Sequence, residues 1–227
     1  MSFLDHIAAC NNADLARFRP FLAGGVQVGH VYPHFAERLA AFPDVFRVDG
    51  AGVAMLPALD TAAKRDAAID RVTRTLAAEG VVKGWRDERY PILPVTGGGT
   101  AVMAMERAAV PHFGARAFGV HMNGFVRKPD GLHLWVGRRA KDRPAYPGML
   151  DNTVAGGIPT GLSVIDTLVK ECGEEAAIPP ALARRAVAVG AITYNYEADG
   201  GLRPDVQYCY DLDLPAVIDQ RRQLIPE

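Results

Sequence analysis

The segment Gly156-Gly-Ile-Pro-Thr-Gly-Leu-Ser163-Val-Ile-Asp166-Thr-Leu-Val-Lys-Glu-Cys-Gly-Glu-Glu-Ala176-Ala-Ile178 decides how the second half of the chain folds. Ser163 precedes an apolar run and Asp166 follows three residues later, a capping box that predicts a helix start at about residue 164. The residues expected to form the buried stripe of this helix are Val164, Ile165, Leu168, Val169 and Cys172. Proline cannot continue a helix, so Pro179 and Pro180 close it after Ala176.

Three glutamates lie near the C-terminal end of this predicted helix. Glu171, Glu174 and Glu175 are spaced at i, i+3 and i+4, so they share one helix face. The helix dipole disfavours a carboxylate at this end by about 0.3–1 kcal/mol, and the like charges repel one another as well. One interpretation is a solvated acidic helix end. The other is a site for Mg²⁺, which binds hard oxygen ligands and completes its shell with substrate phosphate oxygens.

The segment from Gly156 to Ile178 resembles the Nudix box. That pattern is Gly, five residues, Glu, seven residues, Arg-Glu, an aliphatic residue, any residue, Glu-Glu, any residue, Gly and an aliphatic residue. Gly156, Glu171, Glu174-Glu175 and Ile178 match it. Three positions depart from the pattern: Leu162 stands in place of the first Glu, Lys170 in place of Arg, and Ala177 in place of the final Gly.

The surrounding sequence is similar to one branch of the Nudix hydrolases, the thiamine pyrophosphokinase-related branch found in plants, fungi and bacteria. The matching stretches are Leu134–Ala140, Tyr146–Gly157, Lys170–Ala176 and Tyr208–Pro215. The resemblance implies an α/β fold, a Nudix α/β/α sandwich with a mixed sheet over residues 116–227. It also implies a small α+β accessory domain over residues 1–115. Nudix domains generally continue beyond Leu214-Pro215, so we expect the second domain to be truncated at its C-terminus or to end differently.

The activity that the resemblance implies is Mg²⁺-dependent (or Mn²⁺-dependent) hydrolysis of a diphosphate linkage. Glu171, Glu174 and Glu175 would be the catalytic and metal-binding residues, with the Gly156 carbonyl as a further metal ligand. Members of this branch are associated with thiamine diphosphate and its oxidised analogues. Two alternatives remain open: a hydrolase that removes oxidised nucleoside di- or triphosphates, and a catalytically inactive Nudix-fold ligand sensor in which Leu162 marks the loss of catalysis.

Three further residues are candidates for substrate binding. Arg138 and Arg139 follow a predicted strand and would grip phosphate oxygens, although a solvated strand end explains them equally well. Glu197 lies in a turn-rich stretch from 197 to 204 and is a candidate loop acid, either for binding substrate or as general base. The sequence does not choose between Glu197 and the box glutamates as the base.

Composition restricts the partners. The 25 basic and 26 acidic residues give a formal net charge of −1, which argues against a protein that binds nucleic acid through a broad positive field. The apolar stretches are interrupted before the roughly 18 residues that a membrane span requires. Three scattered cysteines predict no disulfide framework, so we expect a cytoplasmic protein. The partner that the resemblance implies is a small-molecule diphosphate substrate, with no nucleic acid and no membrane. A homodimer is left open.

The first half predicts helices over 3–21, 34–42, 61–79 and 101–109, and short strands over 45–48 and 53–56. Gly97-Gly98-Gly99 is interpreted as a linker, and the domain boundary is placed between Pro111 and Ala117. The second half predicts strands over 119–127 and 132–137, joined by the turn Pro129-Asp-Gly131. A polar loop follows over 138–148, and two more strands are expected over 186–194 and 206–212.

Overall fold

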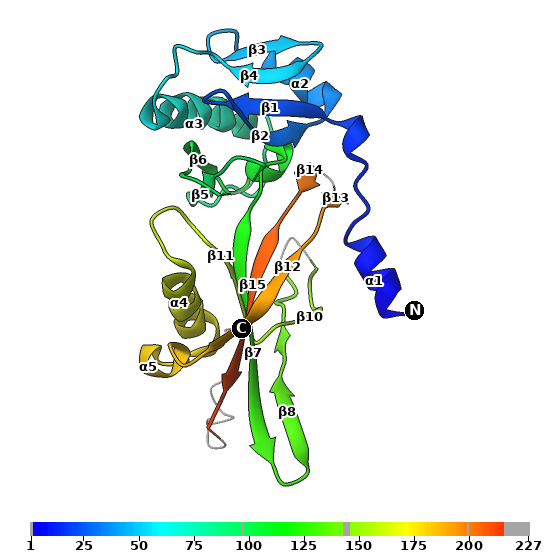
Figure 1. Cartoon of the computed structure of the whole chain (residues 1–227), viewed down its shortest axis with the longest axis vertical. Helices are drawn as coiled ribbons and strands as arrows, with labels where there is room; N and C mark the ends of the chain where they lie inside the picture. The colour runs from blue at the N-terminus through cyan, green and yellow to red at the C-terminus, as the bar shows by residue number, and fades with distance from the viewer. Residues whose placement is uncertain (1, 97, 143–145, 199, 216–227) are drawn as a thin grey trace. The chain divides into compact units, whose positions relative to one another are not determined.

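The computed structural model describes residues 2–96, 98–142, 146–198 and 200–215 (Figure 1). The chain divides into two units between Ala117 and Phe118, and the stretch Thr193–Asp205 belongs to the first unit. The prediction of a second domain over residues 116–227 is wrong for this stretch. Gly97 of the expected linker, part of the 138–148 loop and the chain end, including Gln220–Glu227, lie outside the described residues.

The first unit is built on a sheet with the strand order β2-β1-β4-β3. Its strands are β1 (Arg19–Ala23), β2 (Val26–Val31), β3 (Phe46–Asp49) and β4 (Gly52–Met55). β1 runs parallel to β4 and antiparallel to β2. The helices α2 (Pro33–Leu39) and α3 (Ala62–Ala78) and the strand pair β5 (Arg89–Ile92) and β6 (Met103–Glu106) complete its larger elements.

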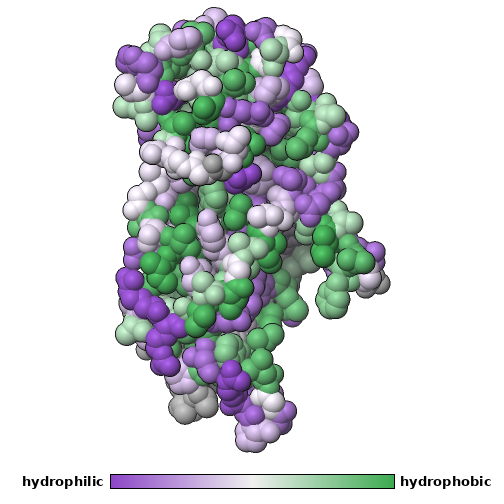
Figure 2. All heavy atoms as spheres, in the orientation of Figure 1, coloured by the Kyte–Doolittle hydropathy of each residue, from purple (hydrophilic) through white to green (hydrophobic). Residues whose placement is uncertain are grey.

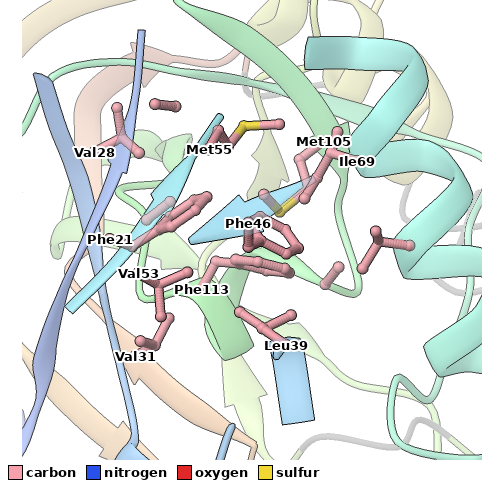
Figure 3. Packing of buried hydrophobic residues seen from close by; sticks show 14 of the residues in the cluster. Phe21, Val28, Val31, Leu39, Phe46, Val53, Met55, Ile69, Met105 and Phe113 are labelled. Carbon is pink, nitrogen blue, oxygen red and sulfur yellow. The ribbon is translucent and has the colours of Figure 1, made fainter. Parts of the chain in front are cut away.

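The core of the first unit is aromatic. Phe21 and Phe113 have ring centroids 5.0 Å apart, and Phe46 lies within 6.4 Å of both rings. Figure 3 shows the three rings converging between the sheet and α3, with Ile69 and Met105 beside them. Burial of such large apolar side chains supplies the dominant favourable term in folding.

Two predicted helices in this unit are wrong. The expected helix over 3–21 is a short helix, α1 (Phe3–Ala9), then a single turn, η1 (Leu15–Arg17), and then β1. Pro20 lies in β1, where Phe21 and Ala23 are buried, so sheet packing decides this segment. Residues 103–106 form β6, whose four side chains are all buried, because it pairs with β5 on one side and α3 covers it.

Helix α3 confirms its prediction. Thr61 caps it by accepting a hydrogen bond from the Lys64 N–H, and Ile69, Val72 and Leu76 are buried. Arg65 and Thr73 complete this buried face. Helix α1, by contrast, has no buried residue: Phe3 is 90% exposed, and apolar atoms are visible in Figure 2 at the place that Figure 1 gives to α1.

The second unit confirms the expected mixed α/β arrangement. Its sheet has the order β11-β7-β15-β12, with β8 (Gly131–Trp135) pairing with part of β7 (Phe118–Lys128). β15 (Val206–Asp213) is parallel to β7, whereas β11 (Val154–Gly157) and β8 are antiparallel to it. β12 (Val187–Thr193) lies at the edge opposite β11. Gly131 has φ +135° in the predicted turn between β7 and β8.

Helices α4 (Val164–Ala176) and α5 (Pro180–Ala183) lie on one side of this sheet (Figure 1). Leu168 and Cys172 of α4 pack against Val120 and Met122 of β7 in the core of the second unit. A short pair, β9 (Gly137–Arg138) and β10 (Leu150–Asp151), follows β8. Among the described residues, no helix has the length and apolar character needed to cross a membrane.

The stretch Thr193–Asp205 of the first unit contains a hairpin, formed by β13 (Tyr196–Ala198) and β14 (Gly201–Arg203). Its base is closed by a hydrogen bond from the Tyr194 N–H to the Asp205 carbonyl. β14 lies so close to the turn η2 (Val110–Phe113) that a Cβ on Gly201 would stand closer than 3.0 Å to the Pro111 carbonyl oxygen. Asn12 further holds the hairpin, because its side chain accepts a hydrogen bond from the Glu197 N–H at 2.7 Å.

Helix α4 ends at a residue in the left-handed region. Ala177 has φ 49° and ψ 28°, at the position where the Nudix pattern has Gly. We predict that Ala177→Gly raises the free energy of unfolding by about 1 kcal/mol, because a side chain makes this conformation costly and Gly adopts it freely. Urea denaturation measures the change. The matched control is Ala67→Gly at an exposed position inside α3, which should lower the free energy of unfolding by about 1 kcal/mol. A loss of stability in both variants would contradict this account of Ala177.

Candidate metal and substrate site

The three glutamates stand on a helix whose start is fixed as expected. Ser163 caps α4 by accepting a hydrogen bond from the Asp166 N–H at 3.1 Å, and its hydroxyl donates to Asp166 Oδ2 at 2.7 Å. Arg184, which follows α5, forms an ion pair with the same carboxylate at 3.1 Å. These groups lower the pKa of Asp166 from its ordinary value, the Ser163 hydroxyl having the largest effect. The first turn of α4 is therefore capped by Ser163 and tied to the residue that follows α5.

Glu175 ties the other end of α4 to strand β11. Its Oε2 accepts a hydrogen bond from the Ala155 N–H at 2.9 Å. β11 is an edge strand, and antiparallel pairing directs alternate N–H groups of an edge strand away from the sheet. Glu175 thus satisfies a backbone donor that the sheet leaves unpaired, and a charged acceptor makes this hydrogen bond stronger than a neutral one.

Glu171 lies against the same strand, one residue further along. A Cβ on Gly156 would stand closer than 3.0 Å to the Glu171 carboxyl carbon, so only glycine leaves room for this side chain. The Glu171 side chain is 12% exposed. The Gly156 carbonyl oxygen is 3.0 Å from where a Cβ on Gly119 of β7 would stand, so it lies toward β7. Glu171 occupies the space that a side chain at Gly156 would fill. The expected role of the Gly156 carbonyl as a metal ligand stays a prediction.

A positive charge already bridges two of the carboxylates. Lys170 Nζ is 3.1 Å from Glu171 Oε1 and 2.8 Å from Glu174 Oε2. These hydrogen bonds, that of Glu174 first, raise the pKa of Lys170, so it remains an ammonium. Glu174 is 59% exposed, and such a surface ion pair contributes little to stability. Glu174 can therefore exchange Lys170 for another cation at small cost.

The charges of the carboxylates also affect the pKa of a neighbouring thiol, that of Cys172. Cys172 is buried between these glutamates, and burial raises the pKa of its thiol to about 12, with further contributions from the charges of Glu175 and Glu171. Cys172 therefore packs in the core of the second unit as a protonated thiol.

The donor set fits a hard divalent cation in its chemistry. Glu171, Glu174 and Glu175 offer carboxylate oxygens at one end of one helix, and Lys170 occupies the place between two of them. In the described part of the chain, no group of three or more His, Cys, Asp or Glu side chains is closed around a common centre. Completing the site therefore requires Lys170 to move, or ligand oxygens to take part.

The structure places the other three predicted residues differently. Arg138 is exposed, and its Nη1 donates to the Gly148 carbonyl at 3.0 Å. Arg139 forms a half-buried ion pair with Asp151 at 2.7 Å. Glu197 lies in the hairpin of the first unit, where Arg17 and Tyr32 bind its carboxylate, while the box glutamates belong to the second unit. The role of Glu197 in substrate binding stays a prediction.

A polar group on the sheet was not expected from the sequence. Asn123 of β7 donates to Asp211 Oδ1 of β15 at 3.1 Å and accepts from the Asn152 side chain at 2.8 Å. Asn123 and Asn152 line a pocket of about 300 Å³ together with Trp135, and the Trp135 Nε1–H has no acceptor among the described residues. Val120 and Met122 of β7 face α4, so Asn123 faces away from it. The available signal was a polar residue, Asn123 or Asp211, between apolar or aromatic neighbours within each of the two strands.

The comparisons with known proteins identify the family. Residues 2–117, about half of the chain, match the family model described as a domain of unknown function, DUF4743. The chain belongs to this family.

Two plant relatives match nearly the whole chain. "Nudix hydrolase 20, chloroplastic" from Arabidopsis thaliana is 40% identical over 225 residues, which cover 94% of this chain and 60% of the relative. "Nudix hydrolase 24, chloroplastic" from the same plant is 39% identical over 217 residues, covering 94% of this chain and 59% of the relative. The chain thus spans about 60% of the length of these relatives. Their names support the resemblance to Nudix hydrolases and leave the branch undecided.

Among solved structures, the NUDIX domain of Shewanella oneidensis NrtR, crystallised with ADP ribose, is similar to part of the chain. The identity is 19%, the TM-score is 0.36, and the match covers 45% of this chain and 62% of that chain.

The close approach of Glu171 to β11 yields a prediction on two glycines. Gly156→Ala should lower the free energy of unfolding by about 1–3 kcal/mol, because the added methyl group displaces the Glu171 carboxylate. Gly173→Ala, on the exposed face of α4 with no atom within 4 Å of the new Cβ, should raise it by about 0.5–1 kcal/mol. Urea denaturation of both variants checks this pair of opposite signs. Equal stability of Gly156→Ala and the parent protein would show that Glu171 does not lie against β11.

Proposed function

We propose that this protein is a Mg²⁺- or Mn²⁺-dependent Nudix hydrolase that cleaves a diphosphate linkage in a small molecule. The observation that carries the proposal is the carboxylate end of α4. Glu175 is bonded to the Ala155 N–H, Glu171 lies in the space that Gly156 leaves, and Glu174 reaches solvent beside a bridging ammonium. The 40% identity to a plant Nudix hydrolase over 94% of the chain supports it.

The three glutamates have different duties in this proposal. Glu175 and Glu171 are positioned by β11, so their charges stay at a fixed place with little conformational freedom to lose on binding. Glu174 is mobile enough to turn from Lys170 toward a ligand. A bound divalent cation would supply charge neutralisation at the phosphates and a water of lowered pKa. Lys170, once released, offers a positive charge to a phosphate oxygen, although as a point charge it lacks the planar fork of Arg.

For the substrate, we propose thiamine diphosphate-type compounds or their oxidised analogues. The support is the similarity of four stretches, from Leu134 to Pro215, to the thiamine pyrophosphokinase-related branch. The balanced charge of the chain fits a small substrate better than a polyanion. Arg138 and Arg139 are proposed to contact its phosphates, and Arg139 would have to share its guanidinium between phosphate and Asp151. Oxidised nucleoside di- and triphosphates are the alternative substrates.

The test is a phosphate-release assay with thiamine diphosphate, oxothiamine diphosphate and 8-oxo-dGTP, each with Mg²⁺, with Mn²⁺ and with EDTA. We expect turnover of a thiamine-type diphosphate with either cation and none with EDTA. Glu171→Gln and Glu174→Gln should each lower kcat about 100-fold or more, the size expected when a charged group that stabilises the transition state is neutralised.

The matched control is Asp166→Asn, the same chemical change at the other end of α4, which should leave kcat unchanged. Unchanged kcat in Glu174→Gln would remove Glu174 from the site. Binding of the diphosphates without turnover of any of them would replace the hydrolase by a Nudix-fold ligand sensor.

A further inference from the structure

The first unit contains a large cleft. Its volume is about 1260 Å³, above the roughly 300–1,000 Å³ of ordinary small-molecule pockets. The cleft is bordered by the segment before η1, by α2 and by the β13–β14 hairpin, all of which belong to the first unit. Among the described residues, the charged side chains that line it are balanced in sign: Arg17, Arg38, Glu37 and Glu197.

A poorly solvated carboxylate stands in this cleft. The Glu197 side chain is only 16% exposed, and its Oε1 accepts hydrogen bonds from Arg17 Nη1 at 2.8 Å and from the Tyr32 hydroxyl at 2.6 Å. Among the described residues, no donor bonds its second oxygen, Oε2. Arg17 is 60% exposed, so it neutralises the charge of Glu197 only in part. An N–H donor on a ligand would complete the hydrogen bonding of this carboxylate.

Aromatic rings lie beside the carboxylate. Tyr32 stacks on His34, with ring centroids 5.1 Å apart and planes inclined by 22°, and on its other neighbour, Phe18, at 4.4 Å. His112 packs on Phe35 at 5.5 Å. Burial lowers the pKa of His112, and the charges of Arg203 and His34 lower it further, so its ring is neutral at pH 7. His34 is exposed and lines the cleft.

We propose that this cleft binds a planar heteroaromatic ring that carries an exocyclic amino group. The amino N–H donates to Glu197 Oε2, and the ring stacks on His34. The remaining donors of Arg17 and Arg38 lie in the lining for polar substituents of the same ligand. A purely apolar ligand would leave the Glu197 carboxylate unsatisfied in a drier environment, and a polyanion would meet two carboxylates as well as two arginines.

The test is isothermal titration of the full chain with two probes that differ by one amino group: adenosine, and purine riboside, which lacks the 6-amino group. We expect adenosine to bind at least about tenfold more tightly, the size of one hydrogen bond to a charged group. Glu197→Gln should remove this preference, and His34→Ala, a change at an exposed position, should weaken both probes equally.

The matched control is Glu88→Gln, which removes a carboxylate from another Arg–Glu pair of 2.8 Å outside the cleft and should leave both affinities unchanged. Glu174→Gln should also leave them unchanged, which separates this cleft from the proposed hydrolytic site. Thermal melting of each variant establishes that it is folded. Three results would overturn the proposal: equal affinity for the two probes, no binding of adenosine at millimolar concentration, or an unchanged preference in Glu197→Gln.

Discussion

The second unit depends on one contact, the attachment of the C-terminal end of α4 to the edge strand β11. The Ala155 N–H has no partner in the sheet, and Glu175 provides one. The missing side chain of Gly156 then lets Glu171 lie against the backbone. Each carboxylate would be unfavourable at this end of a helix by itself. The contacts with β11 and with Lys170 offset this unfavourable electrostatic energy and hold the carboxylate oxygens in place. An unfavourable local arrangement that is stabilised in this way is expected at a functional site.

Local signals were sufficient for the elements that carry the glutamates. The start of α4 at Ser163, its end before Pro179 and the turn at Gly131 follow from caps, prolines and glycine conformation, which act within a few residues. The same holds for α3 and its cap at Thr61. The grouping of Glu171, Glu174 and Glu175 on one face follows from helix geometry alone. Their attachment to β11 does not follow from helix geometry. It depends on the Ala155 backbone N–H and on the absence of a side chain at Gly156, and neither is visible in the pattern of the helix.

The errors share a physical origin in long-range packing. Residues 103–106 have the composition of a helix, yet they are buried on both faces between β5 and α3, so they form a strand. Pro20 and Phe21 enter a sheet through pairing with residues up to 53. Glu197 was assigned by its position in the chain to the second domain, but its partners, Arg17 and Tyr32, are more than 160 residues away. Tertiary contacts of this kind override local propensity.

Because the β13–β14 hairpin belongs to the first unit, the two units cannot be separated by one cut in the chain. β12 and β15 belong to the sheet of the second unit, while the residues that join them, Thr193–Asp205, belong to the first. The polypeptide therefore passes from one unit to the other three times, and a single cut at residue 117 cannot yield two intact pieces. A fragment ending there would expose η2 where Gly201 packs, and the remaining fragment would carry a hairpin without its support. Replacing either unit by an unrelated one would meet the same obstacle, because the hairpin would lose the surface on which it packs.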